Sequence, residues 1–307
     1  FIENDPLNEN FEFEEVGKDV FKNSTLKSPG GHSNRHTAGG LICAQALAAA
    51  DKTVADELNC HSFQCNFIIR VNSNIPVSYH VSRLFDGRSF ANRLVKCEQE
   101  GKINFAAVIA YHKTEPHAIE HQSPMPDVPK QDACEDFNCG WTLLQVLSAR
   151  VPPLFPLRTN YDDPHRQLIF EAFEMRCTDI RYFYTTNNKT SKYYFWTRYK
   201  VIGFSSSRVH ALALLYMSDS NHITTVINAH TREGFQSSMA FSLNHTVYFH
   251  GRSFNANEWM LVELESTNAA HGRGLAQGRI WNEQGDLIAS ITQEVVVRRA
   301  KTEGAKM

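Results

Sequence analysis

Two segments of the chain are apolar on nearly every side of a helix, and they constrain the fold more than any other feature of the sequence. The first, LICAQALAAA, spans residues 41–50, and the second, VHALALLYM, spans residues 209–217. Both are rich in Ala and Leu, which favour helix, and a helix that is apolar all round has to be buried. Neither approaches the ~20 apolar residues that span a bilayer. The sequence therefore predicts two buried helices and no membrane span.

Strand-like segments follow each predicted helix. β-Branched and aromatic residues dominate these segments, and turn residues separate them. The predicted strands are residues 61–71, 77–84, 88–98 and 103–112 in the first half, and residues 241–249, 259–266, 274–282 and 287–298 in the second. RSFAN at residues 88–92 and RGLAQ at residues 273–277 open corresponding strands, so the two halves repeat one plan. We expect an α+β architecture in which an antiparallel sheet wraps around a long central helix, twice.

A stretch rich in proline and acidic residues separates the two halves. Pro124, Pro126 and Pro129 argue against a regular central strand in this stretch. We therefore predict an N-terminal domain over residues 1–113, a linker over residues 114–166 with a short helix near residues 141–150, and a C-terminal domain over residues 167–307.

The charge balance and the cysteines exclude several kinds of site. The chain has 31 basic and 33 acidic residues and a formal net charge of -2. We therefore expect neither nucleic-acid binding nor strong attraction to an anionic membrane. The seven cysteines include no C-x-x-C pair, which favours a reducing compartment and argues against a metal site such as zinc. The first residues lack the apolar segment of a secretory signal.

The last three residues predict a location. Ala305, Lys306 and Met307 form a small, a basic and an aliphatic side chain in succession. This tripeptide is a conservative variant of the Ser-Lys-Leu peroxisomal address. We expect a peroxisomal import receptor to bind it and the protein to be peroxisomal; a chance match would leave the protein in the cytoplasm.

Two polar residues in otherwise apolar segments are candidates for chemistry. Asp219 follows the second predicted helix, where the helix dipole disfavours a carboxylate and partial burial would raise its pKa towards that of a general base. An exposed loop aspartate is the simpler interpretation. Ser242 lies in a predicted strand, with its side chain opposite those of Phe241 and Leu243. An ordinary strand serine would look the same.

Gln293 breaks the repeat between the halves. It lies eight residues after Gly285, whereas the residue eight positions after Gly101 in the first half is Ile109. An amide that replaces an aliphatic side chain in one copy is a functional hint. Together with the carboxylate and the hydroxyl, this amide could hold a water molecule, since a carboxylate accepts a proton while a hydroxyl and an amide orient water. Spacing alone does not bring the three into one site.

Eight motifs follow one another along most of the chain. They are TAGGLICAQALAAA (37–50), HSFQCNFI (61–68), RLFDGRSFANRLV (83–95), EHQSPMP (120–126), SLNHTVYFH (242–250), NEWMLVELES (257–266), RGLAQGRIW (273–281) and GDLIASITQE (285–294). In this order they resemble the acyl-CoA thioesterase II family, which includes bacterial and peroxisomal enzymes. The chain departs from the family pattern at Asn244, where the family usually has an aspartate.

The resemblance implies a tandem, or double, hot-dog fold and the hydrolysis of fatty acyl-CoA to free fatty acid and CoA in fatty-acid metabolism. It implies that Asp219, Ser242 and Gln293 are catalytic and together activate water. No cofactor is expected, because CoA enters as part of the substrate. Gly39 and Gly40, where the backbone can be approached closely, are candidate substrate-binding residues. We also expect a homodimer or a larger homo-oligomer.

Three alternatives remain open. A serine hydrolase would need the motif G-x-S-x-G, and GFSSS at residues 203–207 fails at its last position. A hot-dog enoyl-CoA hydratase or dehydratase would pair a carboxylate with a histidine, for which His245 and His210 are available. A non-catalytic acyl-CoA-binding protein could keep the fold without the reaction.

Overall fold

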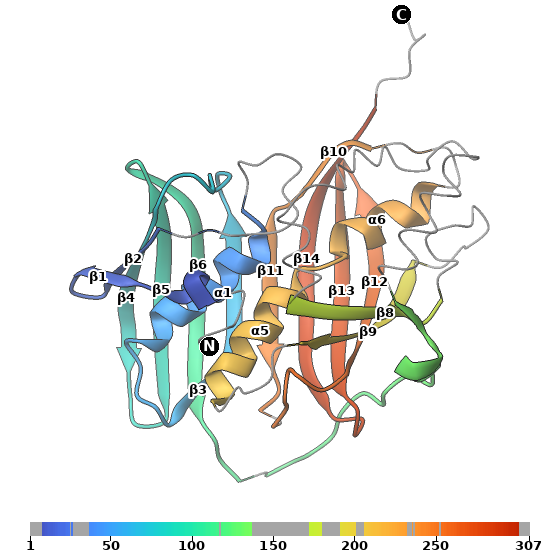
Figure 1. Cartoon of the computed structure of the whole chain (residues 1–307), viewed down its shortest axis with the longest axis horizontal. Coiled ribbons are helices and arrows are strands. Elements are labelled where there is room, and N and C mark those ends of the chain that lie inside the picture. Colours follow the sequence, from blue (N-terminus) through green and yellow to red (C-terminus); the bar gives the residue numbers. More distant parts are fainter. Residues whose placement is uncertain are drawn as a thin grey trace, which may run out of the picture.

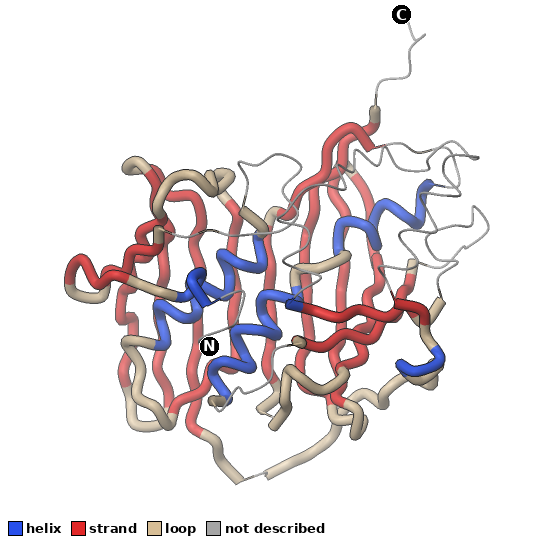
Figure 2. The backbone as a smooth tube through the Cα atoms, viewed as in Figure 1, coloured by secondary structure: helices blue, strands red, loops and turns tan. Residues whose placement is uncertain are grey.

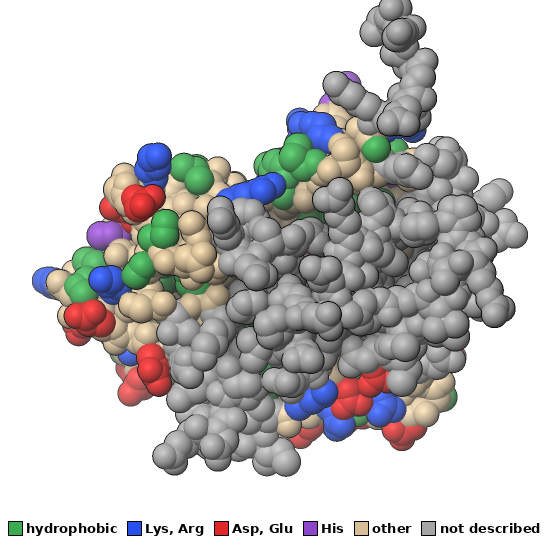
Figure 3. Space-filling view, turned by 45° about the horizontal axis from the view of Figure 1, so that its top comes forward, with side chains coloured by type: hydrophobic (Ala, Val, Ile, Leu, Met, Phe, Trp, Pro, Cys, Tyr) green, Lys and Arg blue, Asp and Glu red, His purple; other side chains and the backbone are tan. Residues whose placement is uncertain are grey.

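The computed structural model describes residues 8–24, 26, 37–116, 118–136, 172–179, 191–200, 206–231, 235, 237–251 and 253–300. These residues form one antiparallel sheet of 14 strands that carries its helices on one face (Figures 1 and 2). None of the helices within these ranges is long and apolar enough to cross a membrane. On the face turned forward in Figure 3, basic and acidic side chains are interspersed over the described surface.

Both predicted buried helices are confirmed. Helix α1 spans Gly39–Asp51 and helix α5 spans Ser207–Ser218, and most of their residues are buried. The N-cap residue Ser206 accepts a hydrogen bond from the backbone N–H of Arg208, which fixes where α5 begins. The two helices lie side by side across the middle of the sheet (Figure 1).

Each half of the chain builds one half of the sheet. The strands of the first half are β1 (Glu14–Gly17), β2 (Val20–Asn23), β3 (Leu58–Phe67), β4 (Val77–Asp86), β5 (Phe90–Gln99) and β6 (Lys102–Lys113). The strands of the second half are β7 (Glu135–Asp136), β8 (Phe173–Cys177), β9 (Lys192–Tyr199), β10 (Ser237–Ser242), β11 (Asn244–Phe249), β12 (Met260–Ala270), β13 (Arg273–Asn282) and β14 (Leu287–Arg299). Short 3₁₀ helices lie at Asn8–Phe11 and Gln131–Ala133.

The strand order confirms the tandem repeat. The sheet runs β1-β2-β4-β5-β6-β3-β11-β14-β13-β12-β9-β8-β7, and β10 also pairs with β14. The order β2-β4-β5-β6-β3 in the first half corresponds to β9-β12-β13-β14-β11 read inward from the other edge. The two copies therefore meet at β3 and β11, where His245 lies opposite Cys65.

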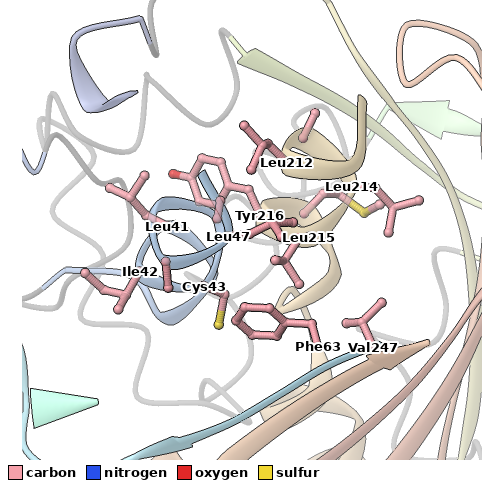
Figure 4. Close-up of a cluster of buried hydrophobic side chains, with 14 of the residues drawn as sticks. Leu41, Ile42, Cys43, Leu47, Phe63, Leu212, Leu214, Leu215, Tyr216 and Val247 are labelled. Atoms are coloured by element: carbon pink, nitrogen blue, oxygen red, sulfur yellow. The ribbon is translucent and has the colours of Figure 1, made fainter. Parts of the chain in front are cut away.

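The core lies between the two helices and the middle of the sheet. Figure 4 shows apolar side chains of α1 and α5, among them Leu47 and Leu215, above Phe63 of β3 and Val247 of β11. Near the C-terminal end of α5, Phe173 of β8 makes an edge-on ring contact with Tyr216. The edge of the sheet therefore curls round towards the helix. Each buried helix is thus wrapped by the sheet of its own half, as the sequence predicts.

The structure differs from the sequence expectations in several places. The strand predicted over residues 61–71 is β3, which begins at Leu58 and ends at Phe67. Helix α6 (His222–Thr231) was not predicted; it packs on β12, β13 and β14 through Val226, for which Gly274 leaves room. The short helix predicted near residues 141–150 lies outside the described residues. The domain boundaries remain a prediction.

The strand predicted over residues 241–249 is divided into two. Ser242 lies opposite Val295, and Thr246 lies opposite Thr292. Four steps along β10 and β11 therefore match three steps along β14, so the strand bulges by one extra residue between Ser242 and Thr246. A bulge bends a strand and re-aims a neighbouring side chain, here that of Ser242.

Candidate active site

Asp219 lies where the two buried helices meet. It is the C-cap residue of α5, and its Oδ2 accepts a hydrogen bond of 2.9 Å from the backbone N–H of Gly40, the second residue of α1. The C-terminal end of α5 carries partial negative charge and disfavours the carboxylate, whereas the N-terminal end of α1 carries partial positive charge and favours it. The Asp219 carboxylate is therefore held by a hydrogen bond that joins the two halves of the chain.

The two glycines that begin α1 make this close meeting possible. A Cβ atom on Gly40 would lie 2.2 Å from the backbone oxygen of Tyr216. A Cβ atom on Gly39 would lie 2.9 Å from Asp219 Oδ2 and 2.9 Å from the Phe67 ring. Both predicted substrate-binding glycines thus lie against the carboxylate, and the close approach explains why neither carries a side chain. Their contact with a substrate remains a prediction.

Gln293 joins the other two predicted site residues. Its Nε2 lies 3.0 Å from Asp219 Oδ1 and 2.5 Å from Ser242 Oγ. Gln293 comes from β14 and is fully buried, while Ser242 ends β10 and is partly buried. The structure therefore brings Asp219, Ser242 and Gln293 together from three different elements.

Two further residues complete the hydrogen bonds of the site. His245 of β11 is fully buried, and its Nδ1 lies 2.6 Å from Gln293 Oε1. Its Nε2 lies 2.8 Å from the hydroxyl of Ser218, the last residue of α5. The sequence pointed to His245 only as a possible hydratase residue, and it gave no signal for Ser218 beyond its place next to Asp219. Neither contact follows from the sequence, because both depend on the packing of α5 over β11.

Burial sets the protonation of the site at neutral pH. It raises the pKa of Asp219 to about 6, although the hydrogen bonds from Gln293 and Gly40 act in the opposite direction. Burial lowers the pKa of His245 to about 4. It also lowers the pKa of His222 on α6 to about 3, and the neighbouring His245 adds to that shift. At pH 7 the site therefore combines an ionised carboxylate with neutral histidines.

The donors and acceptors show what the site can do. Gln293 Nε2 donates one hydrogen bond to Asp219 and one to Ser242, so the Ser242 oxygen accepts a hydrogen bond there and keeps its own proton to donate. A carboxylate offers about four lone-pair directions, and Asp219 receives one hydrogen bond on each oxygen from Gln293 and Gly40. The carboxylate can therefore still accept a proton from a water that the serine hydroxyl orients.

The corresponding place in the first half is closed. Tyr111 lies opposite Ala91, as Gln293 lies opposite Ala276. Tyr111, and not Ile109, is therefore the structural counterpart of Gln293. Counting from the turn glycines was wrong by two residues, since Tyr111 lies further along β6, which begins at Lys102, than Gln293 lies along β14, which begins at Leu287.

The counterpart of the candidate carboxylate also has different neighbours. Asp51 ends α1 and accepts a hydrogen bond of 2.8 Å from the Tyr111 hydroxyl. The Arg208 guanidinium donates to the backbone oxygens of Asp51, Val54, Ala55 and Leu58. The side chains of Tyr111 and Arg208 therefore occupy the space around Asp51, and only the second half keeps the amide and the hydroxyl beside its carboxylate.

Known proteins resemble this chain along both halves. Residues 28–112 match the acyl-CoA thioesterase N-terminal domain, and residues 151–297 match the acyl-CoA thioesterase C-terminal domain. Acyl-coenzyme A thioesterase 8 of Mus musculus is 33% identical over 262 residues, which cover 85% of this chain and 79% of that protein. Acyl-CoA thioesterase 2 of Haemophilus influenzae is 31% identical over 265 residues, which cover 86% of this chain and 88% of that protein.

A solved structure shows the same fold. The crystal structure of an acyl-CoA thioesterase II from Mycobacterium marinum superimposes with a TM-score of 0.74 and 25% identity, over 96% of this chain and 99% of that one. The tandem repeat of strands and helices described above agrees with this likeness. The chain therefore belongs to the acyl-CoA thioesterase family, and it has the double hot-dog fold that the sequence predicts.

Proposed function

We propose that this protein hydrolyses fatty acyl-CoA to a free fatty acid and CoA, with a water molecule that Asp219, Ser242 and Gln293 activate. The observation that carries the proposal is the Gln293 amide, which donates to both the Asp219 carboxylate and the Ser242 hydroxyl. A carboxylate with a pKa of about 6 is ionised at neutral pH and still basic enough to take a proton in the transition state.

The reaction proceeds without a covalent enzyme intermediate. A water bound between Asp219 and Ser242 gives one proton to the Asp219 carboxylate as its oxygen attacks the thioester carbonyl carbon. The carbonyl π bond opens to an oxyanion and re-forms as the carbon–sulfur bond breaks. The proton held by Asp219 then passes to the sulfur, so that CoA leaves as its thiol and the carboxylate is regenerated. Water supplies both the new oxygen of the fatty acid and the proton of the thiol.

The developing oxyanion needs hydrogen-bond donors. The Gln293 amide is not available for this, because both of its Nε2 protons are already directed at Asp219 and Ser242. The proton that Ser242 retains and the backbone N–H of Gly39 are the better candidates, since a helix N-terminus favours negative charge. The Gly40 N–H already donates to Asp219 Oδ2, so Gly39 would contact the thioester through its backbone.

The hydratase alternative is less well supported by the same contacts. Both ring nitrogens of His245 face Gln293 and Ser218, so neither is directed at a substrate. The Nδ1 of His210 accepts the backbone N–H of Ala256 near the other end of α5. Ser218 and His245 form a serine–histidine pair, but Ser218 is only 3% exposed, which argues against its attack on a bulky thioester.

One assay separates these functions. Purified protein is incubated with saturated acyl-CoAs of increasing chain length, and the released thiol is detected with a chromogenic disulfide. The proposal predicts thiol release from at least one chain length, with no acyl-enzyme adduct by mass spectrometry of the quenched reaction. Loss of the enoyl chromophore of an unsaturated acyl-CoA without thiol release would point to the hydratase. Tight binding without turnover of any acyl-CoA would point to the binding protein.

The proposal extends to assembly and location. Val108 of β6 and Tyr248 of β11 expose apolar surface, and Val108 lies on the sheet face opposite the buried helices, which supports a homodimer or larger homo-oligomer. Sedimentation of the purified protein at several concentrations tests the oligomer. The tripeptide Ala305-Lys306-Met307, which lies outside the described residues, supports import into peroxisomes. A fluorescent fusion that hides these three residues should become cytosolic.

A further inference from the structure

Hydrogen-bonding side chains surround both ends of the Gln293 amide. Gln293 is fully buried, and each end of its amide faces other polar side chains. One end lies 3.0 Å from Asp219 Oδ1 and 2.5 Å from Ser242 Oγ, and the other end lies 2.6 Å from His245 Nδ1. Behind the histidine, His245 Nε2 lies 2.8 Å from Ser218 Oγ. The four side chains beyond the amide decide which way it points.

Two arrangements of protons satisfy this chain of contacts. In the first, Ser218 donates to His245 Nε2, the Nδ1–H of His245 donates to Gln293 Oε1, and the Gln293 NH₂ faces Asp219 and Ser242. In the second, Ser218 donates to the Leu215 carbonyl oxygen, which also lies 2.8 Å from it. His245 then carries its proton on Nε2, and the Gln293 amide is turned over so that its oxygen faces Asp219. Only the first arrangement gives Asp219 Oδ1 a donor from Gln293, whereas Oδ2 accepts the Gly40 N–H in both.

We propose that His245 is the positioning residue of this site: in its neutral form with the proton on Nδ1, it commits the Gln293 amide to donate to Asp219 and Ser242. The inference rests on the proposed function, because it assigns His245 a part in activating the same water. His245 does not contact the substrate; it acts through Gln293. Ser218, as the donor to His245 Nε2, selects the tautomer.

Charge favours the arrangement we propose. An ionised Asp219 repels a carbonyl oxygen turned towards it and attracts an amide N–H, and this difference is large in a buried site. The tautomer of a histidine is set by the hydrogen bond that its other nitrogen makes. The groups that titrate near Asp219 are Cys43 of α1, His222 of α6 and His245 of β11, and burial keeps all three neutral at pH 7.

The tautomer can be measured without turnover. The protein is labelled with ¹⁵N in its 14 histidines, and the two nitrogens of His245 are identified by comparison with His245→Asn. We expect a protonated Nδ1 and an unprotonated Nε2 from pH 6.5 to 8. A proton on Nε2 would overturn the inference, because the Gln293 amide would then have to turn its oxygen towards Asp219.

Three substitutions at one position test the role in catalysis. The amide nitrogen of His245→Asn can take the place of Nδ1 and donate to Gln293, whereas that of His245→Gln reaches only the place of Nε2. His245→Leu keeps the bulk without a donor. We expect the leucine and glutamine variants to lose about 100-fold in kcat, the loss typical of a misplaced catalytic group, with KM nearly unchanged. The asparagine variant should retain most of the activity.

The pH profile distinguishes positioning from general damage. Without the Nδ1–H donor, the amide can turn its oxygen towards Asp219 and withdraw a hydrogen bond that lowers the pKa of the carboxyl. The acid limb of kcat/KM should therefore move to higher pH in the leucine variant, whereas a merely weakened fold would lower the curve without moving it. Equal kcat and an unmoved acid limb in a folded His245→Leu would overturn the inference.

The inference and the proposed function fail in different ways. If the wild type releases no thiol from any acyl-CoA, the proposed function fails, while the ¹⁵N measurement still decides the proton arrangement. If the wild type is active and the asparagine variant is no better than the glutamine variant, the function stands and the role of His245 fails. If His245→Leu does not fold, the comparison of asparagine with glutamine and the tautomer give the decision.

Discussion

The Gly40→Ala substitution tests whether the close meeting of α1 and α5 builds the active site. The new methyl carbon would lie 2.2 Å from the backbone oxygen of Tyr216 and 3.1 Å from Asp219 Cβ. Carbon–oxygen contacts in proteins begin at about 3.3 Å, so the two helices would have to part by about 1 Å. The obstructing atom belongs to the backbone, and rotation of a side chain cannot relieve the clash.

The displacement has two measurable costs. The bond from the Gly40 N–H to Asp219 Oδ2, now 2.9 Å long, would be stretched beyond hydrogen-bonding distance. Displacing a catalytic group by about 1 Å costs about 100-fold in rate, so kcat should fall by about that factor. Forcing an extra carbon into a packed core costs about 1–3 kcal/mol. Helix propensity alone predicts the opposite sign, since Ala favours helix by about 1 kcal/mol over Gly.

The assay pairs urea denaturation with thiol release at saturating acyl-CoA. Gly101→Ala is the matched control: nothing lies within 4 Å of the methyl group it would add, but the positive φ of 73° strains it. The control should lose about 1–2 kcal/mol of unfolding free energy and keep the wild-type kcat. A Gly40→Ala protein that is as stable and as active as the wild type would refute the helix–helix contact as the basis of the site.

Three further predictions concern the groups around the two carboxylates. Because burial raises the pKa of Asp219 to about 6 and the base must be ionised, kcat/KM should fall tenfold per pH unit below about pH 6 and level off above it; an acid limb near pH 4 would contradict the assignment. Ser242→Ala should lower kcat by about 100-fold with little change in KM, because the hydroxyl acts on the water and the transition state. Tyr111→Phe should cost about 1–3 kcal/mol in urea denaturation, because it removes the hydrogen bond to buried Asp51. The same variant should leave kcat unchanged. A loss of activity would mean that the side chains around Asp51 do not close this space to substrate.

The sequence predicts the elements whose own pattern is strong. The helices at residues 41–50 and 209–217 were evident because a helix that is apolar on all sides has to lie in the protein interior. Most of the long strands were found within a few residues of their bounds, since β-branched runs and turn residues mark them. Helix α6 was missed because its Thr and Asn residues are weak helix formers, and packing of Val226 and Ile223 against the sheet supplies what propensity does not.

The site is harder to predict than the fold because it depends on register. The resemblance named Asp219, Ser242 and Gln293, but residue counting set Gln293 against Ile109 and not Tyr111. The β6 segment that leads to Tyr111 is longer than the β14 segment that leads to Gln293, and a single sequence does not show this difference. The bulge between Ser242 and Thr246 is equally invisible, since it exists only in relation to β14.

The departure at Asn244 has a structural explanation. Its Oδ1 accepts the backbone N–H of Glu294 at 3.0 Å, next to Gln293 on β14. An aspartate could accept the same hydrogen bond, because both side chains present an oxygen at this position. We therefore expect the asparagine to preserve the local geometry that holds Gln293 and to leave the chemistry unchanged.

The most direct measurement compares Asp219→Asn with the wild type on the acyl-CoA that the wild type hydrolyses fastest. The substitution keeps the size of the side chain and removes the base. A general base contributes about 10²–10⁴-fold to a rate, so kcat should fall by at least 100-fold while acyl-CoA still binds. Full hydrolysis by a folded Asp219→Asn protein would contradict the account, because another group would then have to activate the water.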